Sequence, residues 1–295
     1  MRHRGRARCH RCHRLPALRL KNLAAKVWFV NWLNECLGWM RRASGTMATT
    51  QKCKPVKILS IIMARGGSKG VPGKNIREIG GLPLLAFKAR AAQRSKNPSR
   101  IIISTDSSQI QDVARRYNVE VPFTRPAELA SDTATNFAVL HHAMDHFEAR
   151  GGKFDALLML EPSSPFTKPE DIDRAVAIMI EKNASLVVSM RDVDNPAPFV
   201  GPMESDGRIS KIVDNLKDLK NVNRQVLPHA YTLNGVVYLF RWDKFRNRET
   251  FYSDPENSYG FETDPLCNVE IDSELNLEWA RFLVEKKFID MSLWL

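Results

Sequence analysis

Short, continuous apolar runs alternate with longer amphipathic stretches along this chain, and the alternation limits the folds open to it. The apolar runs are rich in leucine or β-branched residues and lie at residues 57–63, 100–104, 155–160, 185–190 and 235–240. Runs of this length that do not alternate with polar residues are typical of strands buried on both faces, several of them parallel. The sequence therefore predicts an α/β fold with a doubly wound, mostly parallel sheet.

Five amphipathic stretches are predicted to be the helices that cover this sheet. They span residues 84–95, 107–117, 132–150, 169–182 and 275–287. The fourth begins with proline followed by two acids, which is typical of a helix N-terminus because proline lacks an N–H that would be unpaired there and acids complement the helix dipole.

One segment, residues 192–234, breaks the alternation of apolar and amphipathic stretches. It is rich in Asp, Asn, Pro and Lys. We therefore expect it to leave the sheet as a small polar subdomain, called the excursion below.

The net charge of +11 comes almost entirely from one end of the chain. Residues 1–46 hold 11 Lys or Arg and one acid, Glu35, whereas residues 47–295 hold 33 basic and 32 acidic residues. A nearly neutral body offers no general basic surface, so no nucleic-acid partner is expected. We expect residues 1–46 to be a basic extension, unfolded or used for targeting, and residues 47–295 to form one domain.

The basic extension has an apolar middle at residues 27–33, which is too short and too interrupted to span a bilayer. We expect no stable membrane insertion and a cytoplasmic location, with a nuclear or organellar location as the alternative for an Arg-rich, acid-poor leader. Residues 9–13, CHRCH, match the pattern of covalent haem attachment and could also bind a metal, although the flanking arginines would repel a cation.

A basic, glycine-rich loop follows the first predicted strand, at the edge where an α/β sheet binds its ligands. The segment ARGGSKGVPGKN, residues 64–75, contains Arg65, Lys69, Lys74 and four glycines. Glycine lets backbone N–H groups approach an anion without a Cβ in the way, and the three cations would neutralise it. The loop predicts a polyphosphate ligand, and a surface loop with chance charges is the alternative.

Two familiar phosphate-binding motifs do not match this loop. A Walker A loop has glycine where Ser68 stands and Ser or Thr where Asn75 stands. The dinucleotide pattern G-x-G-x-x-G is also absent from the loop. The polyphosphate must therefore be held in another way.

The loop resembles the signature of the acylneuraminate cytidylyltransferases, which make CMP-sialic acid and related CMP-activated nonulosonic acids. Further blocks that resemble this family follow in order: ISTDSSQI at 103–110, RPAELASDTA at 125–134, LEPSSPF at 160–166, RQVLPHAYTLNGVVY at 224–238 and VEIDSELNL at 269–277. The resemblance covers about residues 56–290. It implies a Rossmann-like nucleotidyltransferase fold and a homodimer whose contacts come from the excursion.

The resemblance also implies a reaction, in which a hydroxyl of a nine-carbon α-keto acid sugar attacks the α-phosphorus of CTP and expels pyrophosphate. Positioning and charge neutralisation carry most of the catalysis in such a transfer. The positions that match the family's CTP-binding residues are Ala64, Arg65, Gly66, Gly67, Ser68, Lys74, Asn75, Arg125 and Asp132. Those that match its catalytic residues are Arg65, Lys69, Lys74 and Asp272. Asp132 could instead cap a helix.

A hard divalent cation, Mg²⁺ or Mn²⁺, is the expected cofactor, because phosphoryl transfer generally needs one between the phosphates. The resemblance places its ligands at Glu270 and Asp272. If this segment is a strand, both carboxylates lie on one face because they flank Ile271. The usual family pattern has Asp at both positions, so the longer Glu270 could bind the metal directly, bind it through water or orient the substrate.

The acceptor pocket is predicted from the same resemblance. Its matching positions are Glu161, Ser163, Arg224, Gln225, Tyr231 and Asn234. Arg224 could pair bidentately with the carboxylate of the sugar. Many members of the family have Gln where Glu161 stands and Arg-Pro where Thr232 and Leu233 stand, so the identity of the sugar stays open.

Two other functions are open as alternatives. Residues 192–194 form a D-x-D pattern, which many glycosyltransferases use to hold a metal and a nucleotide sugar, although such a run is also common in solvated turns. The second alternative is a nucleotide-binding protein of the same fold without catalytic activity, because Glu270 stands where the family usually has Asp. His142 and His146 lie one helical turn apart and could bind zinc, but the glutamate of the metalloprotease pattern is missing.

Overall fold

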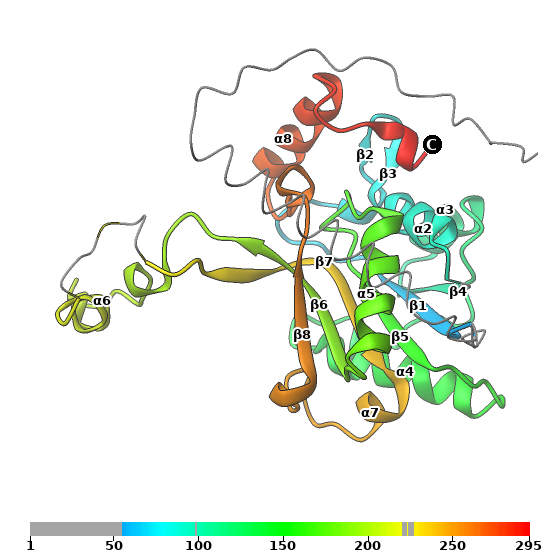
Figure 1. Cartoon of the computed structure of the whole chain (residues 1–295). Coiled ribbons are helices and arrows are strands. Elements are labelled where there is room, and N and C mark those ends of the chain that lie inside the picture. The colour runs from blue at the N-terminus through cyan, green and yellow to red at the C-terminus, as the bar shows by residue number, and fades with distance from the viewer. Residues whose placement is uncertain (1–54, 98, 220–222, 224–226) are drawn as a thin grey trace, which may run out of the picture. The chain divides into compact units, whose positions relative to one another are not determined.

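The computed structural model describes residues 55–97, 99–219, 223 and 227–295, and a six-stranded sheet organises them (Figure 1). In spatial order its strands are β4 (Ser99–Ser104), β1 (Ile58–Met63), β5 (Ala156–Leu160), β7 (Tyr231–Arg241), β6 (Leu186–Asp192) and β8 (Ser258–Glu262). Strand β1 pairs in parallel with β4 and β5, and β6 pairs in parallel with β8. Only β7 runs antiparallel to its neighbours in this sheet.

The five predicted strands are all present, while β8 at the edge of the sheet was not predicted. Its sequence, SYGFE, has one buried residue, Phe261, and therefore lacks a continuous apolar run. The antiparallel direction of β7 is a second difference in detail, since an apolar run predicts burial but not strand direction. The mostly parallel sheet expected from the sequence is confirmed.

Helices cover both faces of the sheet, which makes the fold doubly wound and Rossmann-like. One face carries α2 (Leu84–Arg94), α3 (Ser108–Arg116), α5 (Pro169–Glu181) and α8 (Glu274–Glu285). The other face carries α4 (Asn136–Glu148) and α7 (Trp242–Arg246). A small two-stranded sheet, β2 (Glu78–Ile79) with β3 (Leu82–Pro83), lies between the loop after β1 and α2.

Strand β1 shows how the apolar runs create these layers. Ile58 and Ile62 belong to the core beneath α2 and α5, whereas Leu59 and Ile61 belong to the core beneath α4. Successive side chains of a strand point to opposite faces, so a strand covered on both sides has to be apolar throughout. Each such side chain stabilises the fold by about 1.5–3 kcal/mol through burial.

Helix starts depend on capping groups as well as on amphipathic pattern. Pro169 begins α5 as predicted, and the Asp171 carboxylate accepts from the Lys168 N–H at 2.9 Å. The helix predicted to begin at residue 132 begins at Asn136 instead, because the Thr135 hydroxyl accepts from the Ala138 N–H at 3.1 Å and caps it. This boundary leaves residues 132–134 in the loop beside the candidate site.

The excursion at residues 192–234 is an extension of β6 and β7 beyond the sheet that leads to α6 (Ser210–Leu216), as Figure 1 shows at the left. Helix α6 has no buried residue. Large apolar side chains are exposed along the excursion at Val200, Met203, Ile209 and Val213. The polar subdomain expected from composition therefore also carries a solvent-facing apolar surface.

No helix within the described part of the chain is long and apolar enough to cross a membrane. The basic extension at residues 1–46, with its CHRCH run, lies outside the described residues.

Candidate active site

The basic loop after β1 is held in a fixed path by its own backbone and by one buried amide. Asn75 is 5% exposed, and its Nδ2 donates to the Arg65 carbonyl at 2.9 Å. At the other end, the Ala64 N–H donates to the Ser104 carbonyl at 3.1 Å. The buried Asn75 side chain therefore fixes the backbone of the loop at Arg65.

Gly70 brings the loop against a segment from the far end of the chain. A Cβ built on Gly70 would lie 2.0 Å from the Asp272 carbonyl oxygen, which no side chain can tolerate. Glycine at this position is what lets the loop approach the carboxylate segment so closely.

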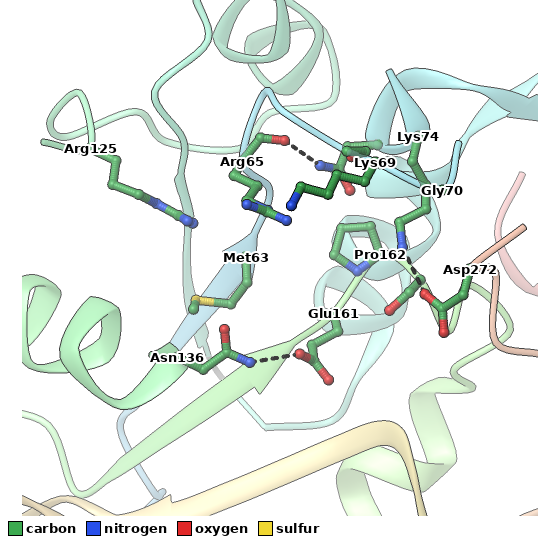
Figure 2. Close-up of a pocket in the computed structure, with 13 residues that line it drawn as sticks. Met63, Arg65, Lys69, Gly70, Lys74, Arg125, Asn136, Glu161, Pro162 and Asp272 are labelled. Carbon is green, nitrogen blue, oxygen red and sulfur yellow. Dashed lines mark hydrogen bonds and ion pairs between the residues drawn. The ribbon is translucent and has the colours of Figure 1, made fainter. Parts of the chain in front are cut away.

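A cavity of about 290 Å³ opens beside this loop (Figure 2). Its walls come from the loop, from the residues after β5, from the start of α4 and from the segment before α8. The lining residues are Met63, Arg65, Ser68, Lys69, Gly70, Lys74, Asn75, Arg125, Asn136, Glu161, Pro162, Ser163 and Asp272. The carboxyl ends of parallel strands β1 and β5 lie here, where an α/β sheet is expected to bind ligands.

One wall of the cavity is cationic and is ordered by Asp132. Its carboxylate pairs with Arg65 at 2.7 Å and with Lys69 at 2.6 Å. Hydrogen bonds from Lys69 and Arg65 hold the pKa of Asp132 below its ordinary value. Since Thr135 caps α4, the helix-cap alternative for Asp132 is wrong.

Lys74 joins the loop to the carboxylate segment. Its ammonium donates to the Ile271 carbonyl at 2.8 Å and pairs with Asp272 at 3.1 Å, and its side chain is only 18% exposed (Figure 2). The ammonium is therefore fixed in position, whereas the Asp272 carboxylate remains 68% exposed and open to a ligand.

Glu270 and Asp272 are both exposed, in a segment that is not a strand. Ile271 between them is buried, and its N–H donates to the Ser163 carbonyl at 2.8 Å. Desolvation by the surrounding protein, followed by the negative charge of Asp272, raises the pKa of Glu270 above its ordinary value. A divalent cation would relieve this repulsion.

The donor set fits Mg²⁺ or Mn²⁺ better than a metal that needs a full protein cage. Two carboxylates supply hard oxygen ligands, and Mg²⁺ is usually held by one or two carboxylates plus phosphate oxygens. Within the described residues no group of three or more His, Cys, Asp or Glu side chains could hold a metal. The phosphates of a nucleotide would have to complete the coordination.

The opposite wall of the cavity contains Glu161, a residue predicted from the sequence to contact the acceptor. Its Oε1 accepts from Asn136 Nδ2 at 2.9 Å, and burial raises the pKa of the carboxyl above its ordinary value (Figure 2). The second oxygen, Oε2, faces Gly235, where a Cβ would lie 3.4 Å from it. Gly235 also has a φ of +65°, which favours glycine.

Arg125 reaches the cavity from the buried side. It is 5% exposed, and its guanidinium donates to the Ser104 hydroxyl at 3.0 Å and the Ser104 carbonyl at 2.5 Å. Burial lowers its pKa to about 10, which leaves it charged at neutral pH. Figure 2 shows the guanidinium directed toward the cavity.

Of the sixteen predicted site residues that the structure describes, nine line this cavity and seven do not. Gly66 gives its N–H to the Asp106 carboxylate at 2.8 Å. Asn234 is buried and bonded to Ser189, Thr263 and Asn268 at 2.6–2.7 Å. The predicted residues that do not line the cavity are Ala64, Gly66, Gly67, Asp132, Tyr231, Asn234 and Glu270. Arg224 and Gln225 lie outside the described residues.

Met63, Asn136 and Pro162 line the cavity but were not predicted as site residues. Pro162 belongs to a block that resembles the family and Met63 directly precedes one, yet neither side chain has a chemical signal of its own. Asn136 lies in the first turn of α4, and only the folded chain brings it within 2.9 Å of Glu161.

The residues of the competing sites do not line this cavity. Asp192 and Asp194 line a separate cavity in the excursion, and Asp192 lies 3.4 Å from the His229 imidazole. His142 and His146 pack their rings against Phe123 at centroid distances of 4.6 and 4.9 Å. Ring packing accounts for both histidines without a zinc ion.

The chain is similar in sequence to known proteins. The family model described as Cytidylyltransferase matches residues 59–291. The CMP-N,N'-diacetyllegionaminic acid synthase of Legionella pneumophila is 36% identical over 240 residues, which is 78% of this chain and 96% of that protein. The N-acylneuraminate cytidylyltransferase of Escherichia coli is 29% identical over 233 residues, 78% of this chain and 53% of that protein.

The fold is also found among solved structures. The structure of CMP:2-keto-3-deoxy-manno-octonic acid synthetase complexed with CTP superposes with a TM-score of 0.58 at 16% identity, covering 78% of this chain and 99% of that one. The 4-diphosphocytidyl-2C-methyl-D-erythritol synthase of Anaerococcus prevotii gives a TM-score of 0.54 at 15% identity, with coverages of 78% and 96%. The chain therefore belongs to the cytidylyltransferase family.

Proposed function

We propose that the chain transfers the cytidylyl group of CTP to a nonulosonic acid and releases pyrophosphate. The observation that carries the proposal is one cavity with cations from a single loop on one wall and Glu161 on the other. A triphosphate suits the cationic wall, and a polyhydroxylated sugar suits the carboxylate and amide of the opposite wall. The sugar hydroxyl oxygen then forms a bond to the α-phosphorus as the bond to pyrophosphate breaks.

Charge neutralisation by fixed cations is the main catalytic contribution in this proposal. Lys74 is held by Ile271 and Asp272, so it needs no reorganisation to stabilise the charge that develops on the departing pyrophosphate. Arg65 and Lys69 are held by Asp132, and they would contact the phosphates from the exposed side. We assign Asp132 to ordering these two cations.

A divalent cation bound by Asp272 and Glu270 would supply charge stabilisation between the phosphates when present. Asp272 is the more accessible of the two as a direct ligand, since its carboxylate is 68% exposed. Glu270 would contribute through its longer side chain or through water. Arg125, held against Ser104, would lie on the side of the cytidine base.

The acceptor is a nonulosonic acid, and we place an N,N'-diacetyllegionaminic acid first among the candidates. One relative named above, at 36% identity, is a CMP-N,N'-diacetyllegionaminic acid synthase. A pseudaminic acid cytidylyltransferase of Campylobacter jejuni is 27% identical over 229 residues, which is 77% of this chain and 96% of that protein. Neuraminic acid is the second candidate.

We further propose a homodimer formed through the excursion. Val200, Met203, Ile209 and Val213 expose between 45% and 74% of their surface, and burying such side chains against a second copy would stabilise the pair. Light scattering coupled to size exclusion should give about twice the chain mass. A monomer at micromolar concentration would contradict this assignment.

The test of the function is a screen of CTP with legionaminic, pseudaminic, neuraminic and 3-deoxy-octulosonic acids in the presence of Mg²⁺, read by pyrophosphate release. The proposal expects at least one nonulosonic acid to react, with the octulosonic acid slower. Turnover of none of these acids would refute it. A rate that is equal with UTP or ATP would refute the cytidylyl assignment.

A further inference from the structure

Lys88 is a fully buried lysine in the middle of α2 that has no part in the chemistry described above. Its ammonium donates to the Thr167 hydroxyl and, at 3.1 Å, to the Val236 carbonyl. Over the residues that the structure describes, Lys88 forms no ion pair. A buried charge is costly unless other groups balance it, so its surroundings decide what it does.

The two groups that Lys88 joins belong to the segment that carries Glu161 and to the segment that faces it. Thr167 belongs to the segment that follows Glu161, and its hydroxyl also donates to the Val236 carbonyl at 3.1 Å. Val236 follows Gly235, the glycine that faces Glu161 Oε2. The side chain of Lys88 therefore connects the segment that follows Glu161 to the segment that faces its carboxylate.

The charge of Lys88 is balanced through the protein interior rather than by contact. Burial lowers the pKa of Lys88 to about 7, and Glu161, Asp171, Cys267 and Glu270 oppose that shift, with Glu161 the strongest of them. Burial raises the pKa of Glu161, and Lys88 is the strongest group that opposes this rise. Each of the two is thus the main electrostatic partner of the other.

We propose that Lys88 is a positioning residue for the acceptor sugar, because it joins the segment that carries Glu161 to the segment that faces this carboxylate. Its buried positive charge also favours the ionised form of Glu161. An ionised Glu161 accepts hydrogen bonds from sugar hydroxyls with both oxygens, and such charge-assisted bonds are stronger than those of a neutral acid. The role toward the sugar rests on the proposed function, whereas the coupling between the two charges does not.

Four proteins test the coupling: the wild type, Lys88→Met, Glu161→Gln and the double variant. Methionine occupies a similar volume, and Thr167 still donates to the Val236 carbonyl, so Lys88→Met is expected to fold. Urea unfolding without substrates is measured at pH 6.5 and pH 9. If the charges interact, the effects of the two substitutions on the unfolding equilibrium constant do not combine additively at pH 6.5. The double variant should then differ from the sum of the single variants by about tenfold, roughly 1.4 kcal/mol.

The same cycle should become additive at pH 9. With its pKa at about 7, Lys88 carries little charge there, so Glu161 has no partner to lose. Additivity at both pH values, or the same non-additivity at both, would overturn the electrostatic coupling, because simple packing contacts do not depend on pH in this way.

The kinetic experiment tests the role toward the sugar. Removing Lys88 lets the pKa of Glu161 rise further, so Lys88→Met should raise the KM for the sugar on the order of tenfold at pH 7, with the KM for CTP within about twofold. Raising the pH to 9 favours the ionised form of Glu161 and should restore most of the sugar KM. Equal, pH-independent losses for both substrates would overturn the positioning role. A wild type inactive with every sugar refutes the proposed function alone, since the unfolding cycle still reports on the pair.

Discussion

Gly70→Ala is expected to separate the basic loop from the carboxylate segment. A Cβ at this position would lie 2.0 Å from the Asp272 carbonyl oxygen, whereas ordinary van der Waals contact begins at 3.4 Å. The two backbones therefore have to move apart by more than about 1 Å, and a misplacement of this size can cost about 10²-fold in rate. Lys74 would move with the loop, away from its contacts with Ile271 and Asp272.

The assay for this variant is pyrophosphate release under saturating CTP and sugar, with thermal melting by circular dichroism in parallel. We expect kcat to fall by about 10²-fold while the chain stays folded. Gly67→Ala is the matched control, because nothing lies within 4 Å of a Cβ at that position, and its loss should be much smaller. If Gly70→Ala keeps kcat within about threefold of the wild type, close approach of the two segments is not needed for catalysis.

Three further predictions concern single side chains. Lys74→Ala should lower kcat more than it raises the KM for CTP, since its charge matters most as pyrophosphate departs, and a change confined to KM would contradict that role. Glu270→Ala should lower the rate on the order of 10²-fold, whereas Glu270→Asp should be tolerated. The Mg²⁺ dependence of the rate is titrated for both variants, and a dependence equal to that of the wild type in both would exclude a metal role for Glu270. Burial raises the pKa of the Cys267 thiol to about 12, so only roughly 10⁻⁴ of the thiol is thiolate at pH 8. Iodoacetamide should therefore label Cys267 only after unfolding, as measured by peptide mass mapping. Rapid labelling of the folded chain would contradict the burial.

The strands and helices were largely predictable because their residues carry the signal themselves. Strand β1 is apolar throughout since it is covered on both faces, and α5 begins at a proline followed by acids. Strand β8 was missed because it lies at the sheet edge with one buried residue, Phe261. The start of α4 was placed too early because a capping threonine, Thr135, outweighed the amphipathic pattern before it.

The cationic half of the site was predictable from the loop, since glycines and basic residues gather there within a short stretch. The contacts that complete the site were not, because they join residues far apart in sequence. Lys74 meets Asp272, Arg65 meets Asp132 and Asn136 meets Glu161 only in the folded chain. The segment around Ile271 is not a strand, so the condition for placing both carboxylates on one face is not met, although Glu270 and Asp272 are both exposed beside the buried Ile271.

Sequence patterns also could not predict the roles of the buried polar side chains. Asn234 resembles a sugar-binding position of the family, but its amide is bonded to Thr263 and Asn268 at 2.6 and 2.7 Å. Lys88 lies within an otherwise amphipathic helix and would be expected on its exposed side. Both depend on partners from other strands and turns, which only the tertiary structure brings together.

The most direct test of cytidylyl transfer is the product itself, observed by ³¹P NMR after incubation of the full chain with CTP, N,N'-diacetyllegionaminic acid and Mg²⁺. Attack at the α-phosphorus predicts a CMP-sugar phosphodiester and pyrophosphate in equal amounts, with both signals strongly reduced for Lys74→Ala. The same pair of signals with neuraminic or pseudaminic acid instead would change only the acceptor. Inorganic phosphate with CDP, or no product from any nonulosonic acid, would contradict the proposed reaction.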